Sequence, residues 1–351
     1  MIINGRGRAF FTDNGLSVTK VAPGKRYRLR IINASCQSSA QLLIDGHTLT
    51  IIELDGIKVN TRVTDGIDIH PGQRISAVLH ANQPIDSYWI RTKISFEGEE
   101  VDDERGFAIL RYDGANSSEL FPHSQKKALA SIIRTEEGIV PYGVPDKVPR
   151  EPDIKINLNF TIYEDNYIVN GKPFFVPSVP VLLQIMNGAD PHKLMPKGSI
   201  ITLPRNKLVE ISLPGGAIAG PHPLHLHGHS FEVIRSINST KYNRINPPIR
   251  DVVNTGMTGD NATIRFMTDN PGPWLLHCHM EFHYEMGLAV VFAEEPSETR
   301  KQEEASLSQE WKDLCTRWER SDRKGKKWSK SIWPGLQKSR FSFKDPAPDD
   351  E

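Results

Sequence analysis

Two short runs of the chain, 222–229 and 277–283, are rich in histidine and constrain its fold more than any other feature. They contain seven of the twelve histidines, and the second run also encloses a cysteine. A lone histidine on a strand is usually a packed or surface residue, but packing alone does not account for seven in two short runs. We therefore predict that the two runs meet at a metal site. Their histidines and cysteine are His222, His225, His227, His229, His277, Cys278, His279 and His283.

The spacing within the runs divides these residues between two faces. Side chains alternate along an extended strand, so the histidines of each His-x-His pair share a face. The cysteine between His277 and His279 must then point the opposite way. His222 stands three residues before His225, which places it on the other side of the extended chain. The alternation predicts two adjacent sites: His222, Cys278 and His283 in one, and His225, His227, His277 and His279 in the other.

The first set has the ligands of a blue-copper site, in which a thiolate and two imidazoles form a plane with a weak or absent axial ligand. Leu288 stands ten residues after Cys278 and cannot coordinate, so at the axial position it would raise the redox potential above that given by methionine. Zinc is the main alternative, but structural zinc sites prefer two to four cysteines. A triplet that divides its side chains between two faces suits a bridge between metal centres. We expect His229 to form hydrogen bonds around the ligands rather than to bind metal.

Most of the chain has the pattern of short strands between turns. Segments such as 27–32 and 49–54 partly alternate apolar and polar residues, and turn signals recur about every 8–12 residues, as in a β-sandwich or barrel. The predicted class is all-β. We expect strand-rich domains at 1–130 and 153–298, joined by a proline-rich linker at 131–152 and followed by a charged, partly helical or disordered tail at 299–351.

Composition argues against two classes of partner. Lysine and arginine number 43, aspartate and glutamate also number 43, and the formal net charge is zero. A nucleic-acid-binding protein is expected to show a basic excess, and the basic run at 321–330 is more typical of a solvated tail. Apolar runs such as 288–293 are too short to span a bilayer. We therefore expect neither nucleic acid nor membrane as a partner.

Cysteines and sequons bear on the cellular compartment. The first residues lack the basic and apolar segments of a signal peptide, so none is expected at this terminus. Three cysteines are too few for a disulfide framework, and the odd number leaves at least one thiol unpaired. The chain nevertheless has five Asn-x-Ser/Thr sequons. A triplet this short can occur by chance, but five of them would also be consistent with a secreted protein. The cysteines are Cys36, Cys278 and Cys315, and the sequons begin at Asn33, Asn116, Asn159, Asn238 and Asn261.

Both histidine runs closely resemble signatures of a known family. HPLHLHGHSF at 222–231 and NPGPWLLHCHMEFHYEMGLAVVF at 270–292 are similar to the third and fourth copper-binding signatures of multicopper oxidases, and more narrowly of fungal laccases. The resemblance implies two cupredoxin-like Greek-key domains, equivalent to the second and third laccase domains, with the first domain missing. The other segments that carry it are 23–33, 44–50 and 81–91, similar to the second domain, and 309–315, similar to the family's C-terminal segment.

The resemblance implies a role for each ligand. Cys278 and His283 are the catalytic pair: substrates give single electrons near His283, and the electrons leave Cys278 for a trinuclear cluster that reduces dioxygen to water. The family holds up to four coppers, and four of the cluster's eight histidines come from two His-x-His motifs in the first domain. Because no such pair precedes His225, we expect one complete copper site here. His222, Cys278 and His283 match type 1 ligands with Leu288 in the axial position, His225 matches a type 2 ligand, and His227, His277 and His279 match type 3 ligands.

The implied enzyme is a secreted, glycosylated laccase-like oxidase of phenols or aromatic amines, of the kind that acts in lignin degradation. In the family, the cysteines matching Cys36 and Cys315 pair with the first domain, so its absence would explain two unpaired thiols. Gln37 replaces an acid that often meets the substrate. Two alternatives stay open. One is a ferroxidase-like oxidase, disfavoured because 215–221 is uncharged, and the other is a copper-binding electron-transfer module without oxidase turnover.

Overall fold

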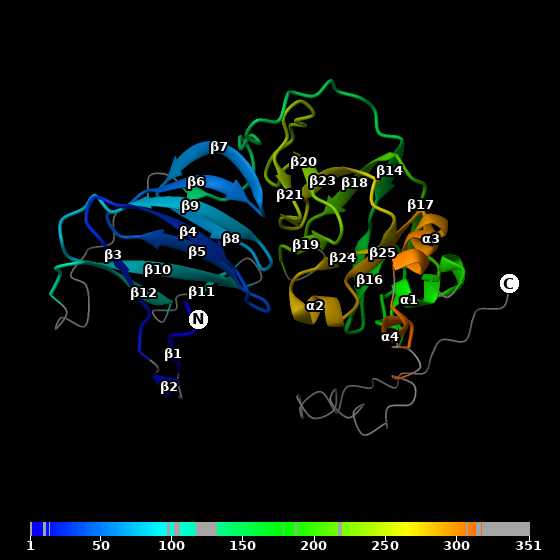
Figure 1. Ribbon diagram of the computed structural model, residues 1–351, viewed down its shortest axis with the longest axis horizontal. Coiled ribbons are helices and arrows are strands. Elements are labelled where there is room, and N and C mark those ends of the chain that lie inside the picture. Colours follow the sequence, from blue (N-terminus) through cyan, green and yellow to red (C-terminus); the bar gives the residue numbers. More distant parts are fainter. Residues whose placement is uncertain are drawn as a thin grey trace.

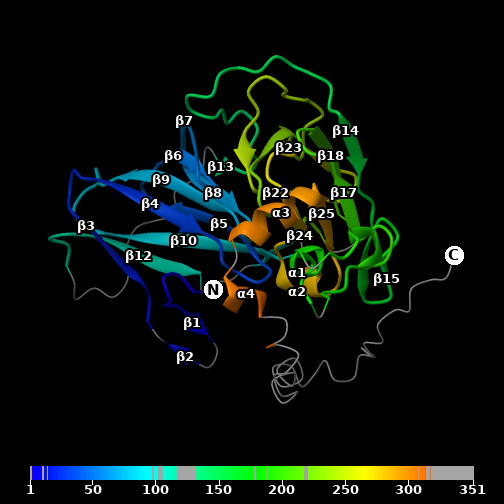
Figure 2. The same cartoon turned by 45° about the vertical axis from the view of Figure 1, so that its right-hand side comes forward.

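The computed structural model describes residues 2–313 and 317, except 10–11, 14, 97–98, 102–105, 117–131, 178, 187, 217–219 and 307. Within these residues strands make up most of the regular structure, and the helices are short. Two strand-rich bodies lie side by side, the first blue to cyan and the second green to orange (Figures 1 and 2). The predicted all-β class is confirmed.

The first body is a sandwich of two mainly antiparallel sheets. One has the order β13-β8-β5-β10-β12-β3, with β11 on β10, and the other has the order β4-β9-β6-β7. Apolar side chains from both sheets, such as Leu49, Ile67 and Leu79, are fully buried between them. The strands are β3 (Val18–Val21), β4 (Arg26–Ile32), β5 (Ser39–Ile44), β6 (Leu49–Leu54), β7 (Ile57–Thr64), β8 (Gly66–Ile69), β9 (Arg74–His80), β10 (Ser87–Phe96), β11 (Glu99–Val101), β12 (Phe107–Tyr112) and β13 (Ile132–Ile133), preceded by a hairpin of β1 (Arg8–Ala9) and β2 (Thr12–Asp13).

The second body is also a sandwich. Its sheets have the orders β14-β18-β23-β20-β21 and β17-β25-β24-β19-β22, and a hairpin of β15 and β16 packs beside them. Ile211 and Phe231 from one sheet meet Leu226 and Phe292 from the other in a shared core. The strands are β14 (Ile154–Asn157), β15 (Phe160–Tyr163), β16 (Asn166–Val169), β17 (Ile200–Leu203), β18 (Leu208–Pro214), β19 (Pro223–Leu226), β20 (Phe231–Arg235), β21 (Ile249–Arg250), β22 (Val252–Asn254), β23 (Asn261–Met267), β24 (Gly272–Cys278) and β25 (Ala289–Glu294).

The second body also contains short helices in the connections between its strands and after its last strand. The helix α2 (Glu281–Glu285) follows β24 directly, whereas α3 (Pro296–Ser306) and α4 (Gln309–Lys312) follow β25. The others are α1 (Val181–Met186) and a 3₁₀ turn, η1 (Pro191–Lys193). Among the described helices, none is long and apolar enough to cross a membrane. Cys315 and the basic run at 321–330 lie outside the described residues.

A buried ion-pair network joins the two bodies. Arg250 on β21 donates to Asp55 of the first body at 2.7 Å and to Glu136, in the segment between β13 and β14, at 2.6 Å. All three side chains are at most 5% exposed. Burial alone would lower the pKa of Arg250, but the two carboxylates outweigh it and raise this pKa. The network thus depends on all three charges being present together.

Replacing Arg250 with methionine is expected to lower the free energy of unfolding by about 3–5 kcal/mol, because two buried carboxylates lose their main partner. The measurement is the urea midpoint of the variant against the unchanged protein. Lys301→Met removes an exposed ion pair with Glu298 and should leave the midpoint almost unchanged. Equal midpoints for all three proteins would show that the buried network does not stabilise the fold.

Candidate metal centre

The two histidine runs lie on neighbouring strands. β19 pairs with β24 antiparallel, and the register sets His225 opposite His277 and Leu224 opposite Cys278. Opposite residues in a ladder share a face, so the two histidines project to one side of the sheet and the cysteine to the other. Cys278 ends β24, and α2 then brings His283 back toward it. Figure 1 shows β19 and α2 on the side of the second body that faces the first.

A buried trio, His222, Cys278 and His283, forms on the cysteine side. The Nδ1 atoms of the two histidines are 3.0 Å apart, and Cys278 Sγ lies 3.8 and 3.7 Å from them. Their donor atoms all lie within 4.8 Å of one another, and no side chain of the trio is more than 4% exposed. A point equidistant from the three atoms is about 2 Å from each, a normal length for a metal–ligand bond. One metal ion therefore fits the trio.

Burial keeps Cys278 and His283 in neutral form until a cation binds. Burial raises the pKa of the Cys278 thiol to about 12 and lowers the pKa of His283 to about 4. At neutral pH the thiol is therefore protonated, and the imidazole has a free lone pair. A metal cation can displace the thiol proton and stabilise the thiolate. Two imidazoles and one thiolate are the donor set that copper prefers.

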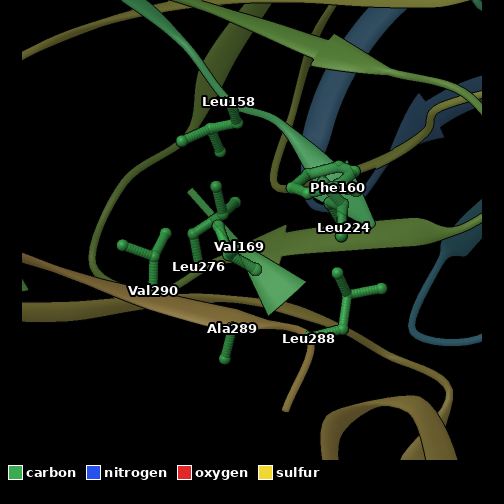
Figure 3. A pocket seen from close by; sticks show the side chains of 8 residues that line it. All are labelled: Leu158, Phe160, Val169, Leu224, Leu276, Leu288, Ala289 and Val290. Carbon is green, nitrogen blue, oxygen red and sulfur yellow. The ribbon is translucent and has the colours of Figure 1, made fainter. Parts of the chain in front are cut away.

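Apolar and aromatic side chains enclose the trio. The ring of Tyr167, the second residue of β16, lies 5.4 Å from the ring of His222 and 4.9 Å from that of His283. Leu288 is 1% exposed, and its backbone carbonyl and N–H bond to Cys278 and His283. Figure 3 shows its side chain at the edge of a small apolar cavity, which is also lined by Leu158, Phe160, Val169, Leu224, Leu276, Ala289 and Val290.

Four histidines, His225, His227, His277 and His279, form a histidine cluster on the other face. Ring centroids of its neighbouring members are 4.7–5.9 Å apart, and the Nε2 atoms of His227 and His277 are 3.1 Å apart. Nδ1 of His225 bonds to the carbonyl of Asp251 at 2.8 Å, and Nδ1 of His277 to that of Cys278 at 2.9 Å. Because a carbonyl only accepts, these Nδ1 atoms carry the protons, and Nε2 is left with a lone pair.

Burial keeps three of the four imidazoles of the cluster, those of His225, His227 and His277, neutral at physiological pH. Burial is the largest cause that lowers the pKa of His277, to about 3, and it also lowers the pKa values of His225 and His227. Close neighbouring histidines add to the effect, since two adjacent positive charges repel. His227 is exposed, whereas the other three rings are half-buried. Unprotonated imidazoles on an accessible face are suited to bind metal.

His229 is held by hydrogen bonds within the second body. Its Nε2 lies 2.9 Å from the buried carboxylate of Glu294, and its ring packs on Phe266 and Trp274. The preceding Gly228 has φ +73°, and a Cβ there would lie 2.2 Å from Trp274. The glycine therefore lets the tryptophan pack beneath the end of the histidine run.

Several residues at these sites carry no local signal in the sequence. Tyr167 comes from a hairpin more than fifty residues before His222, and Asp251 has no metal-ligand spacing. The carbonyl of Cys36, an exposed residue, accepts from the N–H of Glu281 at 2.8 Å, so Gln37 lies near α2. Of the uncharged segment 215–221, the structure describes only the ends. On α2 itself, Glu281 and Glu285 are exposed on either side of His283.

Comparison with known proteins identifies the family. Family models described as multicopper oxidase match residues 1–115 and 174–298. Laccase-1 of Trametes villosa is 46% identical over 92% of this chain and 63% of the relative. Laccase-1 of Pleurotus ostreatus is 47% identical, over 90% of this chain and 59% of the relative.

A solved laccase from Botrytis aclada superposes with a TM-score of 0.73 at 27% identity, covering 87% of this chain and 58% of that one. The chain thus spans about three-fifths of the length of the curated relatives it matches. Copper is the metal that the family binds, in agreement with the two imidazoles and one thiol of the trio. The chain therefore belongs to the multicopper oxidases, a family of copper-dependent oxidoreductases.

Proposed function

We propose that these residues form the electron-accepting part of a laccase-like oxidase. The observation that carries the proposal is the triplet 277–279, in which Cys278 belongs to the buried trio while its two neighbours belong to the histidine cluster. The trio would hold type 1 copper, and Leu288 would stand at its axial position without coordinating it. His225 is assigned to type 2 copper, and His227, His277 and His279 to type 3 copper.

The chain's residues divide the work of such an oxidase. Bound copper would supply one-electron redox chemistry. Phe282, exposed beside the buried His283, offers an aromatic surface for a phenol or aromatic amine. Tyr167 and Leu288 keep water from the trio, and Leu288 provides no axial donor, which favours a high potential. The covalent link from Cys278 to His277 and His279 would carry electrons from copper held by the trio to copper held by the cluster.

The overall reaction balances over four substrate molecules. Each phenol gives one electron and one proton, and dioxygen takes up four of each to form two waters. A trinuclear cluster of the family's kind needs four histidines besides the four described. We assign these to the family's first cupredoxin domain, whose two His-x-His motifs have no counterpart before His225. That domain is the partner that the proposal requires.

The test compares the copper-loaded chain with a fusion to the first domain of a fungal laccase. For the chain alone we expect one tightly bound blue copper and no oxygen uptake on a phenol. The fusion is expected to consume oxygen. Absence of a blue band would refute the trio as a type 1 site. A blue fusion that consumes no oxygen would favour the electron-transfer module, and uptake with ferrous iron but not with phenol would favour a ferroxidase.

We further propose that the protein is secreted and glycosylated, and the structure separates its sequons. Asn159 and Asn238 are exposed, whereas Asn33 is 9% exposed and donates from Nδ2 to two backbone carbonyls. Nδ2 of Asn261 donates to Ser212 Oγ at 2.7 Å. Since the glycan is attached at Nδ2, we expect it on exposed asparagines such as Asn159 and Asn238 and not on the engaged Asn33 and Asn261.

Peptide mapping by mass spectrometry, after secretion from a yeast behind an added leader, measures the occupancy of each sequon. Thr161→Ala should remove the glycan at Asn159 and leave that at Asn238. A glycan on Asn33 in correctly folded protein would contradict the structural argument.

A further inference from the structure

A tight turn of the first body, residues 70–74, lies against the second body beside the histidine cluster. We call it the docking turn. The side-chain amide of Gln73 donates to the carbonyl of Val252 at 3.2 Å, and Asn254 Nδ2 donates to His70 Nε2 at 2.9 Å. Both partners belong to β22, which pairs with β19. The turn is therefore fixed to the strand next to the one that carries His225.

Arg74 connects the docking turn to His225 through Asp251. Its guanidinium donates hydrogen bonds to both carboxylate oxygens of Asp251, at 2.5 and 2.7 Å, and to the backbone carbonyls of Gly72 and Asp55. The backbone carbonyl of the same Asp251 accepts from His225 Nδ1 at 2.8 Å. A two-pronged arginine contact restricts both the position and the rotation of a carboxylate. Arg74 therefore holds the residue that determines which nitrogen of His225 carries the proton.

Gly72 sets the position of a second histidine by direct contact. Its φ is +81°, and a Cβ built there would lie 2.3, 2.6 and 2.8 Å from Cδ2, Cγ and Nε2 of His279. The imidazole of His279 therefore packs directly against the backbone of the turn. Any side chain at 72 would displace the ring or the turn.

We propose that the docking turn is a positioning element for the histidine cluster. Arg74, acting through Asp251, holds His225 with Nδ1 protonated and Nε2 toward the cluster, and Gly72 fixes the plane of the His279 ring. The value of this arrangement for copper rests on the proposed function, but the positioning itself is a property of the metal-free protein. Neither residue is assigned to bind metal or substrate.

His277 provides an internal reference. Its Nδ1 also donates to a backbone carbonyl, that of Cys278 at 2.9 Å, but this contact lies within the second body. Loss of the docking turn's contacts should therefore change His225 and leave His277 as it is. A general loosening of the fold would change both.

The first test uses Arg74→Met in the metal-free protein. Nitrogen-15 NMR of the imidazole rings reports which ring nitrogen carries the proton. We expect His225 to be protonated at Nδ1 in the unchanged protein and to redistribute toward the Nε2-protonated form in the variant, with His277 unaltered. Arg74→Lys keeps the positive charge but lacks the paired N–H donors of the guanidinium, so it should restore the Nδ1-protonated form of His225 only in part.

Arg28→Met is the matched control, since it removes an arginine–carboxylate pair of the same body, with Glu53 at 2.8 Å, whose other side-chain partner is Ser76 rather than a residue of the docking turn. It should leave both histidines unchanged. An unaltered His225 in folded Arg74→Met would overturn the proposal, as would equal changes in His225 and His277.

The second test uses Gly72→Ala against Gly24→Ala. Both glycines have positive φ, +81° and +73°, but a Cβ at 24 meets nothing within 4 Å. Backbone strain is therefore similar, and only the first variant pushes on His279. We expect the ring signals of His279 to shift in Gly72→Ala alone, and copper(II) binding to the cluster to weaken about 10–100-fold. Equal behaviour of the two variants would overturn the role of Gly72. A protein that shows these NMR effects but no blue band would refute the proposed function and leave the positioning intact.

Discussion

Replacing Cys278 with serine is expected to abolish the blue absorption of the copper-loaded protein and to lower its copper content by one per chain. The band of a blue-copper site depends on a thiolate ligand, and a serine hydroxyl does not ionise in a buried apolar site. Serine is close to cysteine in size, and Cys278 is fully buried, so the surrounding core should persist. The measurements are the visible spectrum and metal analysis of the purified variant.

Cys36→Ser is the matched control for this experiment. Cys36 is an exposed free thiol in the first body, outside the buried trio. Its replacement should preserve both the band and the copper content. A blue band that survived Cys278→Ser but disappeared with Cys36→Ser would show that Cys36, and not Cys278, is the thiolate ligand.

Acid is expected to cost the metal-free protein several kcal/mol of unfolding free energy between pH 6.5 and pH 4. Burial lowers the pKa of His70 to about 4, with a contribution from the charge of Arg250, and burial lowers that of His283 to about 4. Above pH 6.5 these histidines are neutral in both states, so they add no pH dependence. Below pH 6.5 these histidines take up protons in the unfolded chain but stay neutral in the folded one. This difference lowers the free energy of unfolding by up to about 3 kcal/mol per histidine by pH 4.

Urea midpoints at pH 7, 6, 5 and 4 measure this loss. His70→Gln removes one of the buried histidines with a lowered pKa and should flatten the decline, whereas His80→Gln changes an exposed histidine at the end of β9 and should leave the decline as it is. A midpoint that stayed constant from pH 7 to pH 4 would show that these histidines are protonated in the folded protein.

Strand alternation predicted how the candidate ligands divide between two faces. It predicted His222, Cys278 and His283 as one set, and the structure places their donor atoms within 4.8 Å of one another. Alternation separates Cys278 from His277 and His279 because the period of two is a local property of an extended chain, whereas His283 approaches Cys278 through α2. Several strands were equally readable: the segment 49–54 is β6, and 27–32 lies within β4.

Other features were beyond local reasoning. Nothing in the spacing of the runs indicates that β19 and β24 pair with His225 opposite His277, because register depends on how two distant strands dock. The position of the Tyr167 ring beside the trio likewise depends on how distant strands dock. These contacts appear only when the sandwich closes around a shared core.

The sequence by itself therefore determined the all-β class and the kind of metal, and it predicted the residues that would bind it, since side-chain chemistry and strand periodicity are local properties of the sequence. Only the tertiary structure decided how the two bodies meet. The Arg250 network and the docking turn join residues about 110–200 positions apart, with Arg74 on Asp251 and Gly72 on His279. Such contacts arise from the relative placement of two folded bodies, which no periodicity within either body specifies.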